Sequence, residues 1–427
     1  MADLLDDLER RGLVQDSTDR AALAERLASG PITLYYGCDP TAPSLHHGNL
    51  IGLIMLRRFQ DGGHRPIALA GGATGMIGDP GGRSEERNLL DLETLTANVA
   101  AIKGQIGRIL GPEGPWTLVD NHAWTKDVLL LDFLRDVGKH VTVNQMVARE
   151  SVKARMTSEH GISFTEFSYM LLQAHDYAWL HEHHGCELQF GGSDQWGNIL
   201  QGVDLIRRRS GVAVHALCWP LLTASDGTKL GKTTGARTWL DPELTSPYAF
   251  HQHFMQTEDA DVARMLAQFT LLPMDDVDAL VAAHAEAPGR RQAQRALAHE
   301  VTVLVHGEEA AAQAEQAAAV LFGSDPREAS AEALAMVARE VPVAAVEAGE
   351  SLATGVDVAT LLVRAGLASS LGDARRQLEQ GGVSVNGTVV ETGRTVTEAD
   401  LLHGRWALLR KGKRGWAVVL AESSASS

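Results

Sequence analysis

The first half of the chain alternates short apolar runs with helical patterns, and this alternation constrains its fold more than any other feature. Runs that read as strands end in glycine or an acidic residue, and the segments between them have the apolar spacing of helices. This order is typical of an α/β domain with a mostly parallel sheet. The expected strands lie in ITLYYGC (32–38), RPIALAGGATG (65–75), WTLVDN (116–121) and CELQFGGSD (186–194), and a helix is expected over 45–60. We therefore predict a doubly wound sheet that binds its ligand at the carboxyl ends of the strands.

The length of the chain indicates more than this one domain. At 427 residues it exceeds what a single hydrophobic core usually serves, so two or three domains are expected. Beyond the α/β region the chain turns helical and Ala/Gln/Glu-rich, continues through an Ala/Glu/Val-rich connector, and ends in short strands and turns. The predicted parts are an α/β domain at 1–245, a helical domain at 246–325, a linker at 326–354 and a small α+β domain at 355–427.

Composition argues against several classes of protein. Hydrophobic residues make up 44% of the chain and charged residues 22%, and its apolar runs are far shorter than a membrane span, so no membrane partner is expected. The N-terminus is acidic and amphipathic, unlike a secretion signal. Cys38, Cys186 and Cys218 are widely spaced, which argues against a disulfide framework and against a thiolate zinc site. A cytoplasmic location is the expectation.

The stretch SDGTKLGKTTG (225–235) resembles a phosphate-binding loop but lacks its spacing. A P-loop needs four residues between its first glycine and the Gly-Lys pair, whereas only three separate Gly227 from Gly231. The following residues, TGARTWLDP, also do not read as the long helix that a P-loop enters. We therefore reject the P-loop and keep Lys229 and Lys232 as candidate phosphate ligands.

A second candidate site lies in YYGCDPTAPSLHHGNL (35–50), where a strand leads through a Pro-rich turn into a helix. The strand brings Tyr35 and Asp39 to the turn, and His46 and Asn49 lie at the helix start. A helix N-terminus with polar donors and a nearby glycine is suited to hold a triphosphate. The alternative is that His46 is only a helix cap or a surface residue.

A third candidate is the polar stripe on the helix FTEFSYMLLQAHDYAWLHEHHG (164–185). Tyr169, Gln173 and Asp176 are spaced by four and three residues, which places them on one face of a mostly apolar helix. This favours a pocket wall over the alternative of a solvated surface stripe. The histidines of HEHHG lack the spacing of a helical metal site and are expected to be solvated.

Together these motifs resemble the bacterial tyrosyl-tRNA synthetases, a branch of the class I aminoacyl-tRNA synthetases. HHGN, in the segment 40–49, corresponds to the class motif HIGH, and KLGKT (229–233) corresponds to KMSKS. GGSDQWGN and FSYMLLQAHD resemble the tyrosine branch in particular. One departure is Asn49, which stands where the class motif has its second histidine. The resemblance spans nearly the whole chain and implies a Rossmann-like catalytic domain.

The resemblance also implies an activity and a set of site residues. Tyrosine would react with ATP, as its Mg²⁺ complex and without a tightly bound protein-ligated metal, and the tyrosyl group would pass from the adenylate to tRNA(Tyr). The residues implied at the phosphates are Thr41, His46, Asn49, Arg83, Arg87, Lys229, Lys232 and Thr233, and ATP would also contact Asp39 and Asp194. The residues implied at tyrosine are Tyr35, Asp79, Tyr169, Gln173, Asp176 and Gln195. A homodimer is implied as well.

The C-terminal part differs in charge from the rest of the chain. From Asp357 onward there are nine Lys/Arg and seven Asp/Glu, a net charge of +2, which leaves −18 upstream of the total of −16. The segment 356–390 resembles the small RNA-binding domain named after ribosomal protein S-four. Its expected RNA contacts are Arg375, Arg376, Arg410, Lys411, Lys413 and Arg414. The alternative is a solvated basic turn.

Other functions share parts of this pattern. An RNA-binding or regulatory protein could carry the same C-terminal domain, but it would need no complete ATP and amino-acid site upstream. A pseudouridine-forming enzyme could carry it as well, but it would use a catalytic Asp in a different fold. The tryptophan enzyme of the same class is the nearer alternative. Its pocket would have no use for an acid facing a phenol, so Asp176 favours tyrosine.

Overall fold

The structure is a computed structural model, and it describes residues 4–79, 90–112, 114–157, 161–221 and 237–421. The chain forms two compact units, each described here by itself. The first comprises Met1–Leu244 with Phe254–Val305, and the second comprises Thr245–His253 with His306–Ser427. Among the described residues, no helix is both long and apolar enough to cross a lipid bilayer.

The first unit is built on a six-stranded sheet in the order β1, β6, β5, β2, β3, β4. All neighbours pair in parallel except β1, which is antiparallel to β6. The strands are β1 (Asp16–Ser17), β2 (Thr33–Cys38), β3 (Arg65–Ala70), β4 (Thr117–Asp120), β5 (Cys186–Gly192) and β6 (His215–Trp219). The predicted doubly wound sheet is confirmed, and β2 to β5 correspond to the four expected strands. The sequence patterns did not predict β1 and β6, which complete the sheet beside β5.

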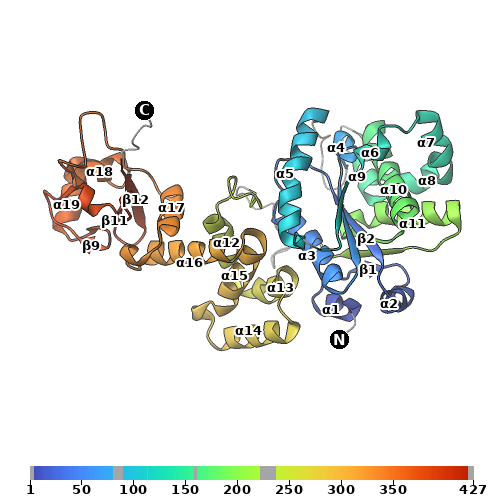
Figure 1. Cartoon of the computed structure of the whole chain (residues 1–427), viewed down its shortest axis with the longest axis horizontal. Helices are drawn as coiled ribbons and strands as arrows, with labels where there is room; N and C mark the ends of the chain where they lie inside the picture. The colour runs from blue at the N-terminus through green and yellow to red at the C-terminus, as the bar shows by residue number, and fades with distance from the viewer. Residues whose placement is uncertain (1–3, 80–89, 113, 158–160, 222–236, 422–427) are drawn as a thin grey trace. The chain divides into compact units, whose positions relative to one another are not determined.

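Helices cover both faces of this sheet. Because side chains alternate along a strand, adjacent tyrosines of β2 point to opposite layers. The Tyr35 ring lies 5.4 Å from the ring of Tyr177 on one face. On the other face Tyr36 packs against Gly52, where an added Cβ would lie 2.3 Å from the tyrosine ring, so this helix position requires glycine. Figure 1 shows α5 (Leu92–Leu110) on one side of the sheet and α10 (Phe164–His184) with α11 (Trp196–Ser210) on the other.

The helix that carries Gly52 is α3 (His47–Asp61), which follows β2 and corresponds to the helix expected over 45–60. The first unit also contains α1 (Leu4–Arg10), α2 (Arg20–Ala28), α4 (Thr74–Ile77), α6 (His122–Thr125), α7 (Leu130–Asp136), α8 (Val143–Val147), α9 (Glu150–Met156), α13 (Asp259–Phe269) and α14 (Met274–Glu286). The chain passes between the units after Leu244, within α12 (Pro247–Met255) and before the last residue of α15 (Gln292–His306). The chain from 246 to 323 is thus mainly helical, as its composition predicted.

The second unit joins helices to a small antiparallel sheet in the order β12, β11, β8, β9. The strands of this sheet are β8 (Val383–Val385), β9 (Thr388–Val389), β11 (Trp406–Lys411) and β12 (Gly415–Leu420), while β7 (Val356–Asp357) and β10 (Thr395–Val396) pair with each other in a separate two-stranded sheet. The helices of the unit are α16 (Glu308–Phe322), α17 (Ala331–Glu340), α18 (Val358–Arg364) and α19 (Leu371–Glu379). Leu334 and Val337 of α17 are buried in one cluster with Trp406 and Trp416. These tryptophans are therefore core residues, although they neighbour the basic segment in sequence.

Candidate active site

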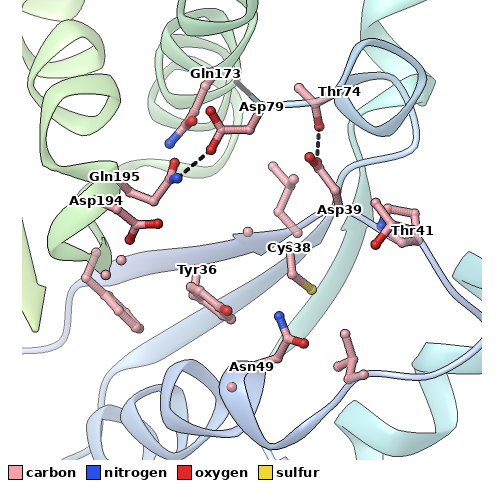
Figure 2. A pocket seen from close by; sticks show the side chains of 18 of the residues that line it. Tyr36, Cys38, Asp39, Thr41, Asn49, Thr74, Asp79, Gln173, Asp194 and Gln195 are labelled. Carbon is pink, nitrogen blue, oxygen red and sulfur yellow. Dashed lines mark hydrogen bonds between the residues drawn. The ribbon is translucent and has the colours of Figure 1, made fainter. Parts of the chain in front are cut away.

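A cavity of about 380 Å³ opens in the first unit where β2 and β5 end. Its wall is completed by the turn after β2, the start of α3, one side of α10 and the short 3₁₀ turn η2 (Ser193–Gln195). Eleven of the residues expected to bind substrate line this one cavity: Tyr35, Asp39, Thr41, His46, Asn49, Asp79, Tyr169, Gln173, Asp176, Asp194 and Gln195. Figure 2 shows several of them facing a common space from the strand ends and the surrounding helices. Arg83, Arg87, Lys229, Lys232 and Thr233 lie outside the described residues.

Asp176 is the buried acid of the cavity. Its side chain is held by two donors: Asn121 Nδ2 donates to Oδ2 and Trp124 Nε1 donates to Oδ1, each at 2.9 Å. Burial raises the pKa of Asp176 to about 7, although the hydrogen bonds from Asn121 and Trp124 lower it. The carboxyl group is thus fixed in orientation, and it is poised to change protonation near neutral pH.

Tyr35 lies near this acid and is also buried, with 2% of its surface exposed. Its hydroxyl has no hydrogen-bond partner among the described residues. Burial, and next the charge of Asp176, raise the pKa of Tyr35 well above its usual value, so the hydroxyl keeps its proton. A buried donor without a partner costs free energy unless a ligand satisfies it. Tyr35 and Asp176 therefore offer a donor and an acceptor to one ligand group.

Further hydrogen bonds fix the middle of the cavity. Thr74 Oγ1 donates to Asp39 Oδ1 at 2.7 Å, and the Tyr169 hydroxyl donates to Asp39 Oδ2 at 3.1 Å. Gln195 Nε2 donates to Asp79 Oδ2 at 2.6 Å. Figure 2 shows the two bonds made by Thr74 and Gln195, with Gln173 beside the latter. The stripe on α10 is thus part of the cavity wall, and Asp39 and Asp79 present carboxylates suited to an ammonium group or to hydroxyl donors.

The start of α3 forms the other end of the cavity. His46 is the N-cap: its Nδ1 accepts from the Gly48 N–H at 3.0 Å, and Asn49 Oδ1 accepts from the His46 N–H at 3.2 Å. These two reciprocal bonds give partners to two backbone N–H groups that have none within the helix at its N-terminus. Burial, with smaller effects of His47 and Arg237, lowers the pKa of His46 to about 4. A neutral ring whose Nδ1 accepts carries its proton on Nε2, so His46 offers a neutral donor and no positive charge.

Sequence reasoning missed several residues that shape the site. Asn121 and Trp124 follow β4, and the only available signal was a polar residue at the end of an expected strand. Neither spacing nor composition indicated that residues 237–241 return to the start of α3. They do so through the bond from the His47 N–H to the Thr238 carbonyl at 3.0 Å, and through that from the Leu240 N–H to the Leu45 carbonyl at 2.8 Å.

The basic residues expected to bind RNA all belong to the second unit, but some are exposed and others contact neighbouring residues of the unit. Arg375 and Arg376 on α19, and Lys413 and Arg414 in the turn between β11 and β12, are exposed. The Arg410 guanidinium lies 5.0 Å from the centre of the Trp416 ring. Lys411 Nζ donates to the Leu367 carbonyl at 2.6 Å and lies 3.9 Å from an oxygen of Asp373 on α19. Arg410 and Lys411 are therefore engaged within the unit.

Comparison with protein families matches nearly the whole chain. The family described as "tRNA synthetases class I (W and Y)" matches residues 27–323, and the family described as "Tyrosine--tRNA ligase SYY-like C-terminal domain" matches residues 334–419. The tyrosine–tRNA ligase of Opitutus terrae is 52% identical over 420 residues, covering 97% of this chain and 99% of that protein. The tyrosine–tRNA ligase of Mycobacterium bovis is 50% identical over 424 residues, covering 97% and 98%.

Solved structures give the same assignment for the larger part of the chain. A C-terminally truncated mitochondrial tyrosyl-tRNA synthetase from Aspergillus nidulans superposes with a TM-score of 0.69 at 32% identity, covering 75% of this chain and 95% of that one. The corresponding protein from Coccidioides posadasii gives a TM-score of 0.65 at 33% identity, covering 74% and 91%.

Proposed function

The chain belongs to the class I aminoacyl-tRNA synthetases of the tryptophan and tyrosine branch, and on this basis we propose how its cavity performs the tyrosine–tRNA ligase reaction. The tyrosine carboxylate attacks the α-phosphorus of ATP, pyrophosphate leaves with the bonding electron pair, and tyrosyl-adenylate forms. A terminal ribose hydroxyl of tRNA(Tyr) then attacks the tyrosyl carbonyl carbon, and AMP leaves. Neither step needs a protein nucleophile.

The observation that carries the choice of tyrosine is the buried pair of Tyr35 and Asp176. The substrate phenol would donate to the Asp176 carboxylate and accept from the Tyr35 hydroxyl, which has no other partner among the described residues. Phenylalanine would leave the Tyr35 hydroxyl without a partner and would give the Asp176 carboxylate no donor beyond Asn121 and Trp124. Such a site rejects the analogue that lacks the hydroxyl, and tyrosyl-tRNA synthetase is itself the worked example behind that general rule.

The remaining cavity residues divide between the two ends of the adenylate. Tyr169, Gln173 and Asp79 would hold the α-ammonium group of tyrosine, with Gln195 beside them. Asp39 and Asp194 would contact the adenosine part of ATP, and Asp194 would accept hydrogen bonds from the ribose hydroxyls. Carboxylates suit these places because both the ammonium group and the ribose hydroxyls are donors.

The phosphates would lie at the start of α3, near Thr41, His46 and Asn49. Neutral His46 contributes a hydrogen bond there, so positive charge has to come from other residues. Lys229, Lys232, Thr233, Arg83 and Arg87 are proposed for this role from their sequence alone. ATP would enter with Mg²⁺ on its phosphates, which lowers the charge that the protein must meet. Rate enhancement would come from positioning and from these cations.

Binding of the tRNA body is proposed for the second unit, through its exposed basic residues. We propose a catalytic part at 1–245, a helical part at 246–325, a linker at 326–354 that contains the packed helix α17, and an RNA-binding part at 355–427. Because the reaction serves translation, we propose the cytoplasm as its location.

We also propose that the enzyme is a homodimer. Large apolar side chains are exposed on the consecutive helices α7, α8 and α9 and at the start of α10: Leu129, Leu130, Leu131, Leu134, Val143, Met156 and Phe164. Figure 1 shows α7, α8 and α10 at the same end of the first unit. A second copy of the chain is the occupant that family resemblance implies for such a surface.

Sedimentation velocity tests the dimer. Leu131→Glu, at a side chain that is 77% exposed, should yield monomers. The control Val212→Glu, at a 44% exposed apolar residue outside these helices, should remain dimeric. A dimeric Leu131→Glu protein of native stability would contradict this surface as the interface.

Tyrosine specificity is tested by amino-acid-dependent exchange between ATP and labelled pyrophosphate. Each standard amino acid is supplied in turn to the full-length enzyme, and tyrosine alone should support rapid exchange. Exchange driven by tryptophan would assign the enzyme to the other branch of its family. Absence of exchange with any amino acid, in a protein that remains folded, would contradict the proposed chemistry.

A further inference from the structure

The charge of the cavity does not match the polyphosphate that it is proposed to bind. Four aspartates line it: Asp39, Asp79, Asp176 and Asp194. Among the described lining residues, Arg237 is the one lysine or arginine. A triphosphate inserted between aspartates needs cations, because like charges in a partly buried site repel strongly. Arg237 is therefore the described residue best suited in charge to the phosphates.

The position of Arg237 is set by its neighbours. Its guanidinium carbon lies 5.7 Å from the centre of the Trp239 ring, a cation–π arrangement. The Trp239 ring meets the His46 ring edge-on at 6.2 Å, and these two residues also form an antiparallel backbone bridge. Arg237 is thus placed at the same end of the cavity as the start of α3.

The guanidinium is available to a ligand. Arg237 is exposed at the cavity and has no ion pair or hydrogen bond with any residue in the described ranges. By contrast, many other arginines of the first unit pair with carboxylates, as Arg26 does with Glu187 at 2.6 Å. The influence of Arg237 on the His46 ring, whose pKa it helps to lower, is consistent with their closeness. The cation–π contact with Trp239 involves no carboxylate or other hydrogen-bond acceptor.

We propose that Arg237 is a further catalytic residue, whose guanidinium donates hydrogen bonds to the β- and γ-phosphates of ATP and to the departing pyrophosphate. The inference rests on the proposed function of the cavity. When tyrosine attacks, the bond between the α-phosphorus and the bridging oxygen breaks and its electron pair moves to pyrophosphate. A guanidinium remains charged throughout, so Arg237 stabilises that negative charge without giving up a proton.

The alternative is that Arg237 only covers the Trp239 ring. A covering role would not depend on charge, so the planar, uncharged amide of glutamine would replace the arginine in part. A phosphate contact depends on positive charge, so only lysine would replace it in part. Three variants separate these roles: Arg237→Ala, Arg237→Gln and Arg237→Lys. Arg108→Ala is the matched control, because Arg108 is an exposed arginine on α5 that does not line the cavity.

The experiment measures tyrosine-dependent ATP–pyrophosphate exchange by the full-length enzyme, with ATP, tyrosine and pyrophosphate varied separately. Hydrogen bonds to charged groups correspond to losses of roughly 10- to 100-fold. We expect Arg237→Ala and Arg237→Gln to lower kcat/KM for ATP by about that factor and to raise the KM for pyrophosphate. The KM for tyrosine and inhibition by adenosine, which lacks phosphates, should stay within about twofold of wild type. Lysine should recover most of the loss.

Several outcomes would overturn the proposal. Native kcat/KM for ATP in Arg237→Ala would do so, as would full activity of Arg237→Gln. Equal weakening of ATP and adenosine would assign Arg237 to the shape of the site. The glutamine variant keeps the test decisive if the alanine variant is unstable. If the wild-type enzyme shows no tyrosine-dependent exchange, the proposed function itself fails. If the wild-type enzyme and the Arg237 variants are equally active, only the role of Arg237 fails.

Discussion

The indole Nε1 of Trp124 donates a 2.9 Å hydrogen bond to Oδ1 of Asp176, and this bond joins the segment after β4 to the buried acid of α10. Together with the bond from Asn121 Nδ2 it fixes both carboxyl oxygens. The acid that is proposed to read the tyrosine hydroxyl is therefore oriented by residues that need not touch the substrate themselves.

Trp124→Phe should shift the pH dependence of tyrosine activation. Removing this donor raises the pKa of Asp176 above its value of about 7, because the hydrogen bond favours the charged form. The carboxylate accepts the phenol proton better than the acid does, so kcat/KM for tyrosine should rise with pH and should do so at higher pH in the variant. We expect a loss of roughly 3- to 10-fold at pH 7 that is largely recovered at pH 9.

The matched control is Trp116→Phe, which removes an indole donor to the Gly111 carbonyl away from the cavity. Its pH profile should match that of wild type. A uniform loss for Trp124→Phe at every pH would indicate a packing defect and not a change in the pKa of Asp176.

The raised pKa of Asp176 should also make the free energy of unfolding depend on pH. Because the folded pKa lies above the ordinary 3.8, the folded protein binds more protons between about pH 4 and 7, and Asp176 destabilises the fold increasingly as pH rises through that window.

Tyr35→Phe and Asp176→Ala should differ in size of effect and in stability. Loss of the Tyr35 hydroxyl removes a neutral hydrogen bond, so kcat/KM for tyrosine should fall by roughly 3- to 10-fold. Its melting temperature should not fall, since the hydroxyl has no partner among the described residues. Asp176→Ala should lower tyrosine activation by more than about 100-fold. Comparable activity of Asp176→Ala and wild type would remove this acid from tyrosine recognition.

Lys229 and Lys232 lie outside the described residues, so the effects of Lys229→Ala and Lys232→Ala are predicted from the sequence motif. Each should slow adenylate formation by orders of magnitude in single-turnover measurements, because charge on the leaving pyrophosphate develops mainly in the transition state. Equilibrium dialysis should find tyrosine affinity nearly unchanged. Parallel losses in binding and rate would point instead to a structural role for this loop.

Neutralising the exposed basic residues of the second unit should weaken tRNA binding and its salt dependence. The variant replaces Arg375, Arg376, Lys413 and Arg414 with glutamine. The slope of log K against log salt should fall by about one for each lost phosphate contact, while tyrosine-dependent pyrophosphate exchange stays native. Arg410→Gln should mainly lower the melting temperature, because that guanidinium packs on Trp416. An unchanged slope in the fourfold variant would select a merely solvated basic turn.

Much of the fold could be predicted from local patterns. Strands β2 to β5 and helix α3 were expected from apolar runs and the residues that end them. Strands that are buried on both faces consist of nearly uninterrupted runs of hydrophobic residues, which can be recognised in the sequence. The strands β1 and β6 were not expected. A two-residue strand has too little sequence to show alternation, and its pairing with β6 depends on a partner some 200 residues away, as between Asp16 and Cys218.

The cavity residues could be proposed from the sequence because their spacing and motif context are local. Tyr169, Gln173 and Asp176 share a helix face by periodicity alone, and His46 and Asn49 belong to a recognisable motif at a helix start. Tertiary structure alone decided that they meet, because parallel strands bring together segments distant in the chain. It also decided the state of each group: burial keeps His46 neutral and raises the pKa of Asp176 to about 7, and burial is a property of the folded surroundings. The contacts of Trp124 and Arg237 had no local signal, since each depends on where a loop returns after the sheet has formed.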